Sequence, residues 1–174
     1  KRGAEKIRCM INGKETESNV LYDNIEKMRA VERFLKEIRR TGIDEDMVIA
    51  LFMADVQNRE SFEDISRLEA IKDYIPREKY NTDIIKDREH NLFSIKIYEK
   101  TGKDTPIEID YEMCSQDDYL EALNTFQQIK DFYTGNIKIV DGIKEERQIN
   151  AKELIKLLNE KNKEGITIQR YKGL

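Results

Sequence analysis

Histidine, cysteine, proline and glycine-rich loops are scarce in this chain of 174 residues, and each scarcity excludes a class of protein. The chain has one histidine, two cysteines and two prolines. Cys9 and Cys114 lie too far apart for the paired spacing of a zinc site or a redox motif, so we expect two buried or idle thiols. No GxxxxGK[ST] or GxGxxG run occurs, so a glycine loop that holds phosphate is not predicted. With two prolines and no low-complexity segment, no flexible linker is indicated.

Long apolar runs are also missing. No stretch approaches the ~18 consecutive apolar residues that a transmembrane helix needs. Lys1-Arg2-Gly3 is followed by charged residues, and not by the apolar segment of a signal peptide. We therefore expect no contact with a membrane and a cytoplasmic location. The first residue is not Met, which favours a start within a longer polypeptide.

Charge is abundant and nearly balanced. The chain has 31 basic and 35 acidic residues, a net charge of −4 and a mean hydropathy of −0.74. This excludes a protein whose whole surface attracts nucleic acid, but it leaves room for a local basic patch. A chain of this length buries roughly two-thirds of its unfolded surface, so a real core is expected.

The first half of the sequence has helical periodicity. Lys6–Ile11 and the Asn12-Gly13 turn predict a short strand or hairpin arm. Apolar residues at steps of three and four then predict a helix over about 20–40, which ends at Thr41-Gly42. Asp44 is expected to cap a second helix that forms a hairpin with the first. Residues 61–64 resemble a capping box for a third helix, which ends before Pro76.

The second half changes to strands mixed with helices. Alternation at 93, 95 and 97 and again at 107, 109 and 111 predicts a β-hairpin. Ser115 is expected to cap a long helix closed by Gly135, and residues 137–140 are expected to form a strand. Asn150 caps a further predicted helix, and residues 166–170 predict a closing strand.

The periodicity changes near residues 86–90, which predicts two lobes. We therefore expect an α+β fold with a helical hairpin lobe and a smaller lobe of mixed sheet and helix. The predicted domains are an N-terminal strand or hairpin arm (1–18), the helical lobe (19–89) and the α+β lobe (90–174).

Few residues are candidates for catalysis. His90 is the only histidine, so a nucleophilic site would have to combine it with Ser94 or Cys114. A loop histidine is the simpler interpretation, and one histidine does not indicate a zinc site.

Two pairs of acidic residues are candidates for metal binding. Glu108 and Asp110 lie two apart on a predicted strand, and Asp117 and Asp118 lie at a predicted helix start. Paired carboxylates can bind Mg²⁺, but acids also favour the first turn of a helix and the solvent face of a strand. We therefore predict no catalytic, cofactor-binding or metal-binding residues.

A row of cations is the candidate binding surface. Its members recur at steps of four, three and four on one face of the first predicted helix: Arg29, Arg33, Lys36 and Arg40. Such a row could follow a phosphate backbone or contact an acidic partner. Interspersed glutamates also suit an ordinary solvated helix face.

The last six residues carry the most specific motif. Gln169, Arg170, Tyr171, Lys172, Gly173 and Leu174 spell QRYKGL. This string resembles the motif with which the gyrase B family of bacterial DNA gyrases, which are type II topoisomerases, re-enters its metal-binding catalytic region. In that family the motif continues with Gly-Glu-Met. Members with a large insertion show a similar order before it: a hairpin entered at an HNLF-like segment (here 90–93), a helix, a strand and a helix. The resemblance covers most of 90–174 and is weaker over 1–89.

This resemblance implies an identity for the chain and for its ends. It implies the insert that interrupts the TOPRIM region of gyrase B, in an enzyme that uses ATP and Mg²⁺ to introduce negative supercoils. KRGAEK would be the turn of a hairpin whose first strand lies upstream, and QRYKGL would be cut before its turn is complete.

The resemblance also limits the chemistry expected of the chain. The ATP-binding module, the catalytic glutamate and the DxD pair of the family are absent, so we expect this chain to be inactive alone. The DNA-cleaving tyrosine belongs to gyrase A, the other gyrase polypeptide, so Tyr171 is not expected to be a nucleophile. The implied partners are double-stranded DNA, gyrase A and the rest of gyrase B, with Arg170 and Lys172 as further contact residues. The alternative is a structural or protein-interaction module with no DNA contact.

Overall fold

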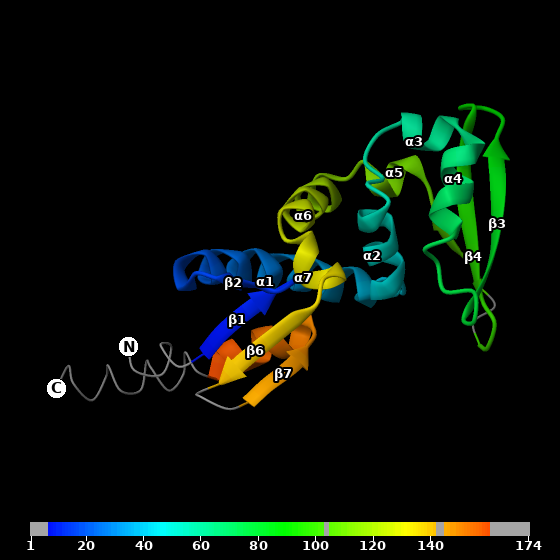
Figure 1. The fold of residues 1–174 in the computed structure, drawn as a ribbon. Helices are drawn as coiled ribbons and strands as arrows, with labels where there is room; N and C mark the ends of the chain where they lie inside the picture. The colour runs from blue at the N-terminus through cyan, green and yellow to red at the C-terminus, as the bar shows by residue number, and fades with distance from the viewer. Residues whose placement is uncertain (1–6, 103–104, 142–144, 161–174) are drawn as a thin grey trace. The chain divides into compact units, whose positions relative to one another are not determined.

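The computed structural model describes residues 7–102, 105–141 and 145–160, and these form an α+β fold, as predicted (Figure 1). Residues 151–160 are helical. The other elements, in chain order, are β1 (Ile7–Ile11), β2 (Lys14–Thr16), α1 (Ser18–Arg40), α2 (Glu45–Met53), α3 (Glu60–Glu63), α4 (Ile65–Lys72), β3 (Tyr80–Asp87), β4 (Leu92–Glu99), β5 (Ile107–Ile109), α5 (Tyr111–Cys114), α6 (Asp117–Gln128), α7 (Lys130–Thr134), β6 (Ile137–Asp141) and β7 (Glu145–Ile149).

The chain divides into two compact units. Unit 1 comprises residues 1–29 and 128–174, and unit 2 comprises residues 30–127. These bounds differ from the three ranges expected from the sequence. One reason is that β3 and β4 pair along their whole length, so the residues on both sides of position 90 belong to the same unit.

Unit 1 contains a four-stranded antiparallel sheet in the order β2-β1-β6-β7. The turn between β1 and β2 is at Asn12-Gly13, with φ values of 52° and 83°, as the sequence predicts. The Asn12 side chain accepts a hydrogen bond from the backbone N–H of Asn136 at 3.0 Å. A Cβ added to Gly135 would lie 2.5 Å from the carbonyl oxygen of Asp131, so only glycine fits this close approach.

The core of unit 1 is mainly aliphatic and comes from the sheet, the start of α1, the segment at α7 and the helix at 151–160. Its buried hydrophobic residues are Cys9, Leu21, Ile25, Met28, Ile129, Phe132, Ile137, Ile139, Ile149, Ala151, Leu154 and Leu158. The predicted cap of the last helix is confirmed, because Asn150 Oδ1 accepts from the backbone N–H of Glu153 at 2.9 Å.

Unit 2 contains a three-stranded antiparallel sheet in the order β3-β4-β5, against which α3 and α4 pack (Figure 1). The predicted pairing of the second hairpin is confirmed, with Ile95 opposite Ile109 and Ile97 opposite Ile107. Helix α1 stops before Gly42, which has φ 96°, and Asp44 caps α2 by accepting from the N–H of Asp46. Both helix boundaries agree with the sequence analysis.

An aromatic cluster fills the core of unit 2. The ring centroid of Phe52 lies 5.3 Å from that of Tyr119 and 5.4 Å from that of Phe126, and Phe34 stacks on Phe52 at 6.0 Å. Tyr119 is buried, and its hydroxyl donates to the carbonyl of Val56 at 2.8 Å. The polar end of this large side chain is therefore satisfied inside the core.

Several predicted boundaries were wrong. The third helix is capped by Asp64 and not by Ser61, which is buried in α3 and bonded to Asn58. Tyr111 is not in a strand, because Asp110 caps the short helix α5 there. Ser115 lies at the C-terminal end of α5 and donates to the carbonyl of Glu112, so it is not the cap of a long helix.

The predicted long helix is two helices. Ile129 leaves the helical region, with φ −121° and ψ 18°, and separates α6 from α7. Phe126, Ile129 and Phe132 are all buried, so the spacing of three continues across the break and hides it in the sequence. Strands β3 and β7 were not predicted, and the expected strand at 166–170 lies outside the described residues.

Candidate functional site

Unit 2 has a cavity of about 370 Å³ beside the turn that joins β3 to β4. We call it the acidic cavity. Its carboxylates are Asp87, Glu108, Asp110 and Glu112. Its other lining residues are Leu92, Phe93, Tyr111, Ser94, His90 and Arg59.

Three of these carboxylates are held by the protein itself. Ser94, only 6% exposed, donates its hydroxyl to Glu108 Oε1 at 2.8 Å. Asp110 Oδ1 accepts from the backbone N–H of Met113 at 2.9 Å, and Asp87 Oδ1 accepts from that of Glu89 at 2.9 Å. Glu112 is exposed. The three held carboxylates therefore have fixed positions, and the second oxygens of Glu108 and Asp110 can accept further hydrogen bonds.

His90 is part of an exposed ion pair at the rim of this cavity. Its Nδ1 lies 2.8 Å from Asp87 Oδ2, and the hydrogen bond and charge of Asp87 raise the pKa of the imidazole. The same hydrogen bond lowers the pKa of Asp87. Arg59 donates to the carbonyl of His90 at 3.2 Å and also pairs with Glu63 at 3.0 Å. His90 is thus a loop residue whose imidazole is held by Asp87 and whose carbonyl is held by Arg59.

The structure brings His90 and Ser94 to one cavity but gives them different partners. Ser94 donates to Glu108, whereas His90 pairs with Asp87. Cys114 is buried in α5, and burial raises its pKa to about 12. A thiol of this kind is a poor nucleophile at neutral pH. This arrangement does not resemble a nucleophile activated by a neighbouring base.

The acidic pairs occupy ordinary structural positions. Glu108 is on β5, Asp110 caps α5, and Asp117 and Asp118 lie in the first turn of α6, where carboxylates favour the helix dipole. Within the described ranges, no group of three or more His, Cys, Asp or Glu side chains has the geometry to hold a metal ion.

The row of cations on α1 is only partly available. Arg29 pairs with Glu26 and donates to Asn159, and only 27% of its side chain is exposed. Arg33, Lys36 and Arg40 are exposed, and among the described residues they form no ion pair. The part of this row that could bind an anion therefore consists of three residues, all in unit 2. The predicted contact residues Arg170 and Lys172, with the rest of the 169–174 motif, lie outside the described residues.

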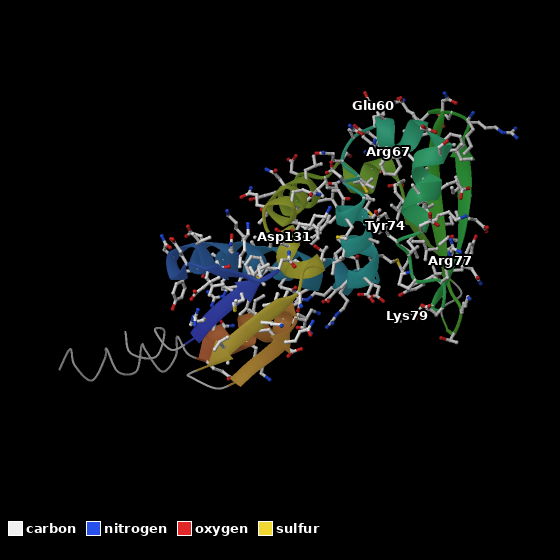
Figure 2. All side chains as sticks on the ribbon, viewed as in Figure 1. Glu60, Arg67, Tyr74, Arg77, Lys79 and Asp131 are labelled. Carbon is white, nitrogen blue, oxygen red and sulfur yellow. The ribbon has the colours of Figure 1, made fainter. Side chains whose placement is uncertain are left out.

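Two further cavities lie in unit 2. A cavity of about 720 Å³ borders α2 and β5, and in its wall the Tyr80 hydroxyl donates to Asp44 Oδ2 at 2.5 Å. A polar cavity of about 340 Å³ lies near Lys72, Arg77 and Lys100. Arg77 and Lys79 follow the half-exposed Tyr74 beyond the end of α4 (Figure 2). Arg77 pairs with Asp73, and Lys79 pairs with Asp46.

Sequence reasoning missed Arg59, Asp87 and Tyr111 as parts of one site. The acidic cavity depends on the pairing of β3 with β4, and β3 was not predicted. The charges of Asp87, Glu108 and Glu112 are visible in the sequence, but no local pattern places them around one cavity.

The two units carry opposite formal charges. Unit 1 has 17 basic and 12 acidic residues, a net charge of +5, and unit 2 has 14 basic and 23 acidic residues, a net charge of −9. The chain total of −4 hides this difference. The unit that holds both the acidic cavity and Arg33, Lys36 and Arg40 is thus strongly acidic.

Among the described residues, no helix is both long and apolar enough to cross a bilayer. Comparison of the sequence with models of protein families and with curated proteins finds no match.

Proposed function

We propose that this chain is the insert domain of a gyrase B-type polypeptide, an accessory part of an ATP-dependent type II topoisomerase that negatively supercoils DNA. The observation that carries the proposal is the QRYKGL string at 169–174. Helix α6, strand β6 and the helix at 151–160 precede it in the order that the resemblance implies, and they support the proposal.

In this proposal the chain contributes no catalytic residue. ATP and Mg²⁺ are bound by the rest of gyrase B, and DNA is cleaved by the tyrosine of gyrase A. Each unit has a packed core and can therefore act as a rigid support within the enzyme. In this proposal, exposed charged side chains of the chain contact DNA or gyrase A.

The proposed DNA contact uses Arg33, Lys36 and Arg40. They are exposed on one face of α1 and form no ion pair among the described residues, so they can approach phosphates without first breaking an internal contact. Arg29, bonded to Glu26 and Asn159, contributes less.

A second candidate is a structural or protein-interaction module that does not contact DNA. The net charge of −9 on unit 2 favours it, because an acidic surface repels a phosphate backbone. The two candidates differ in whether the three cations matter for DNA binding.

The family assignment is tested by the reading frame that encodes the chain. We expect Gly-Glu-Met directly after Leu174 and the acidic TOPRIM residues upstream of Lys1. A frame that continues with other residues would remove the assignment, whatever the three cations do.

The contact is tested by charge reversal in the intact enzyme. The variant Arg33→Glu/Lys36→Glu/Arg40→Glu should weaken DNA binding and make its dependence on log salt less steep by about 2–3. The control Arg67→Glu/Arg88→Glu/Lys100→Glu changes the charge of unit 2 by the same amount at other exposed positions. If both variants bind DNA and supercoil it equally well, the DNA contact is wrong and the protein-interaction candidate stands.

A further inference from the structure

We propose that Asn12 is a site of spontaneous deamidation, and that the isoaspartyl product of this reaction opens the turn between β1 and β2. The inference goes beyond the proposed function and does not depend on the family assignment, because it uses only described residues of unit 1. Asn12-Gly13 is the one Asn-Gly pair in the sequence.

The reaction needs water as its only co-reactant, and nothing is oxidised or reduced. The backbone nitrogen of Gly13 attacks Cγ of the Asn12 side chain and forms a C–N bond, which closes a succinimide ring. The side-chain amide group leaves as ammonia and takes the proton of the Gly13 N–H. Water then hydrolyses one of the two ring carbonyls, which gives either aspartate or isoaspartate at position 12.

The attacking nitrogen is accessible in the structure. Asn12 and Gly13 are both exposed, and a Cβ added to Gly13 would meet nothing within 4 Å. Among the described residues, no backbone carbonyl accepts a hydrogen bond from the N–H of Gly13. Neither a side chain nor a hydrogen bond therefore shields this nitrogen.

The turn itself selects the reactive pair. Ile11 pairs with Lys14, so the loop between β1 and β2 consists of two residues, with φ values of 52° and 83°. A loop of this kind requires positive φ at both positions and favours Asn-Gly. The sequence that makes the turn is therefore also the sequence that allows the ring to close.

The turn is held on one side but is open to local unfolding on the other. Asn12 Oδ1 accepts from the N–H of Asn136 at 3.0 Å, and the N–H of Asn12 donates to the carbonyl of Asn136 at 3.0 Å. Strand β2 has three residues and lies at the edge of its sheet, and its exposed Arg8–Glu15 ion pair with β1 adds little stability. Short exposed elements of this kind open most easily, and an open turn frees the Asn12 side chain for the reaction.

The two products differ in their effect on the turn. In isoaspartate the main chain runs through the former side chain, so the backbone gains a methylene group between positions 12 and 13. The turn then no longer fixes the register in which Cys9 lies opposite Thr16. In ordinary aspartate the main chain is unchanged, and the carboxylate can still accept from the N–H of Asn136.

The test follows deamidation in the full 174-residue chain, aged in mildly alkaline buffer and analysed by mass spectrometry of its peptides. Asn91 is a matched internal control, because it is exposed and has φ 55° in the turn between β3 and β4, but Leu92 follows it. We expect Asn12 to react at least about tenfold faster than Asn91, a difference of about 1.4 kcal/mol in the barrier. Isoaspartate is detected by methylation with protein-L-isoaspartate methyltransferase.

A variant isolates the role of Gly13. Gly13→Asp introduces a side chain beside the attacking nitrogen, while aspartate tolerates positive φ and keeps the turn. We expect deamidation of Asn12 in this variant to slow to about the rate of Asn91.

The opening of the turn is tested by amide hydrogen exchange on the separated isoaspartyl form. We expect the amides of 14–16 to exchange at least about tenfold faster in this form than in the fresh chain. The matched control is Asn12→Asp, which carries the same added charge without the extra methylene group and should exchange like the wild type.

Each part of the proposal has results that overturn it. Equal rates at Asn12 and Asn91, an unchanged rate in Gly13→Asp, or a product without isoaspartate would remove the modification site. Unchanged exchange in the isoaspartyl form, or the same increase in Asn12→Asp, would remove the opening of the turn.

Discussion

At the scale of single residues, the clearest measurable group is His90. It is the only histidine in the chain, so its imidazole signals have no overlap with those of another histidine in an NMR spectrum. The sequence analysis predicts a loop residue, and the structure adds its partner: Asp87, three residues earlier at the end of β3. That partner follows from the turn geometry, in which Asn91 has φ 55°, and no helix or strand pattern predicts it.

We predict that the pKa of His90 is above the usual value for histidine, about 6.5. The hydrogen bond and charge of Asp87 favour the imidazolium, and the nearby charge of Glu89 adds to this. A histidine whose pKa is raised by folding contributes stability below its unfolded pKa, and this contribution is lost as the pH rises through the folded pKa. The lowered pKa of Asp87 acts in the opposite direction, so its contribution is lost as the pH falls.

An NMR titration of the imidazole checks this prediction. Asp87→Asn should lower the pKa of His90, whereas Asp83→Asn, at another exposed position on the same strand, should leave it nearly unchanged. If the two variants titrate alike, the ion pair does not exist in solution.

At the scale of helices and strands, four local signals were predicted correctly, whereas the caps expected at Ser61 and Ser115 were wrong. Asn12-Gly13, Gly42, Asp44 and Asn150 end or begin their elements as expected, because turns and caps depend on residues within four positions of one another. The elements that were missed depend on distant residues. The sequence YNTDIIKD becomes strand β3 because Ile84 and Thr82 pair with Ile95 and Ile97 of β4, and the alternation of the strand alone is too short to show this.

Asp44 shows how a local cap acquires a distant role. It caps α2, and its other carboxylate oxygen accepts from Tyr80 at the start of β3, 36 residues away. We predict that Asp44→Ala lowers the free energy of unfolding by about 2–3 kcal/mol, since it removes a cap and leaves a part-buried hydroxyl without its partner. Asp64→Ala, which removes only the cap of α4, should cost about 1 kcal/mol.

A double-mutant cycle separates the two roles of Asp44. Asp44→Ala and Tyr80→Phe should be coupled by about 1 kcal/mol in urea unfolding, whereas Asp64→Ala and Tyr80→Phe should be additive. Additivity of the first pair would mean that the Tyr80–Asp44 hydrogen bond adds nothing to stability.

At the scale of the whole molecule, the division into units is the feature that was hardest to predict from the sequence. The change in hydrophobic period expected near residue 90 lies inside the β3–β4 hairpin, which has a strand on each side of it. The last helix before this hairpin, α4, ends at Lys72, and β3 begins at Tyr80. A periodicity seen in the sequence does not show which elements share a core. The opposite charges of the units were also not predicted, because unit 1 combines residues from both ends of the chain and the sequence alone does not show that these residues belong together.

This division predicts which fragment folds alone. Residues 30–127 form a continuous segment that contains the aromatic cluster of Phe34, Phe52, Tyr119 and Phe126 and all three strands of its sheet. We expect this fragment to unfold cooperatively in urea and to keep the raised pKa of His90, because the contacts behind both properties lie within it.

Residues 19–89 end between β3 and β4 and lack Tyr119 and Phe126, so β3 would have no partner and Phe52 would lose its packing. That fragment should have little near-ultraviolet circular dichroism and no cooperative transition. A folded 19–89 beside an unfolded 30–127 would instead place the boundary where the hydrophobic period changes.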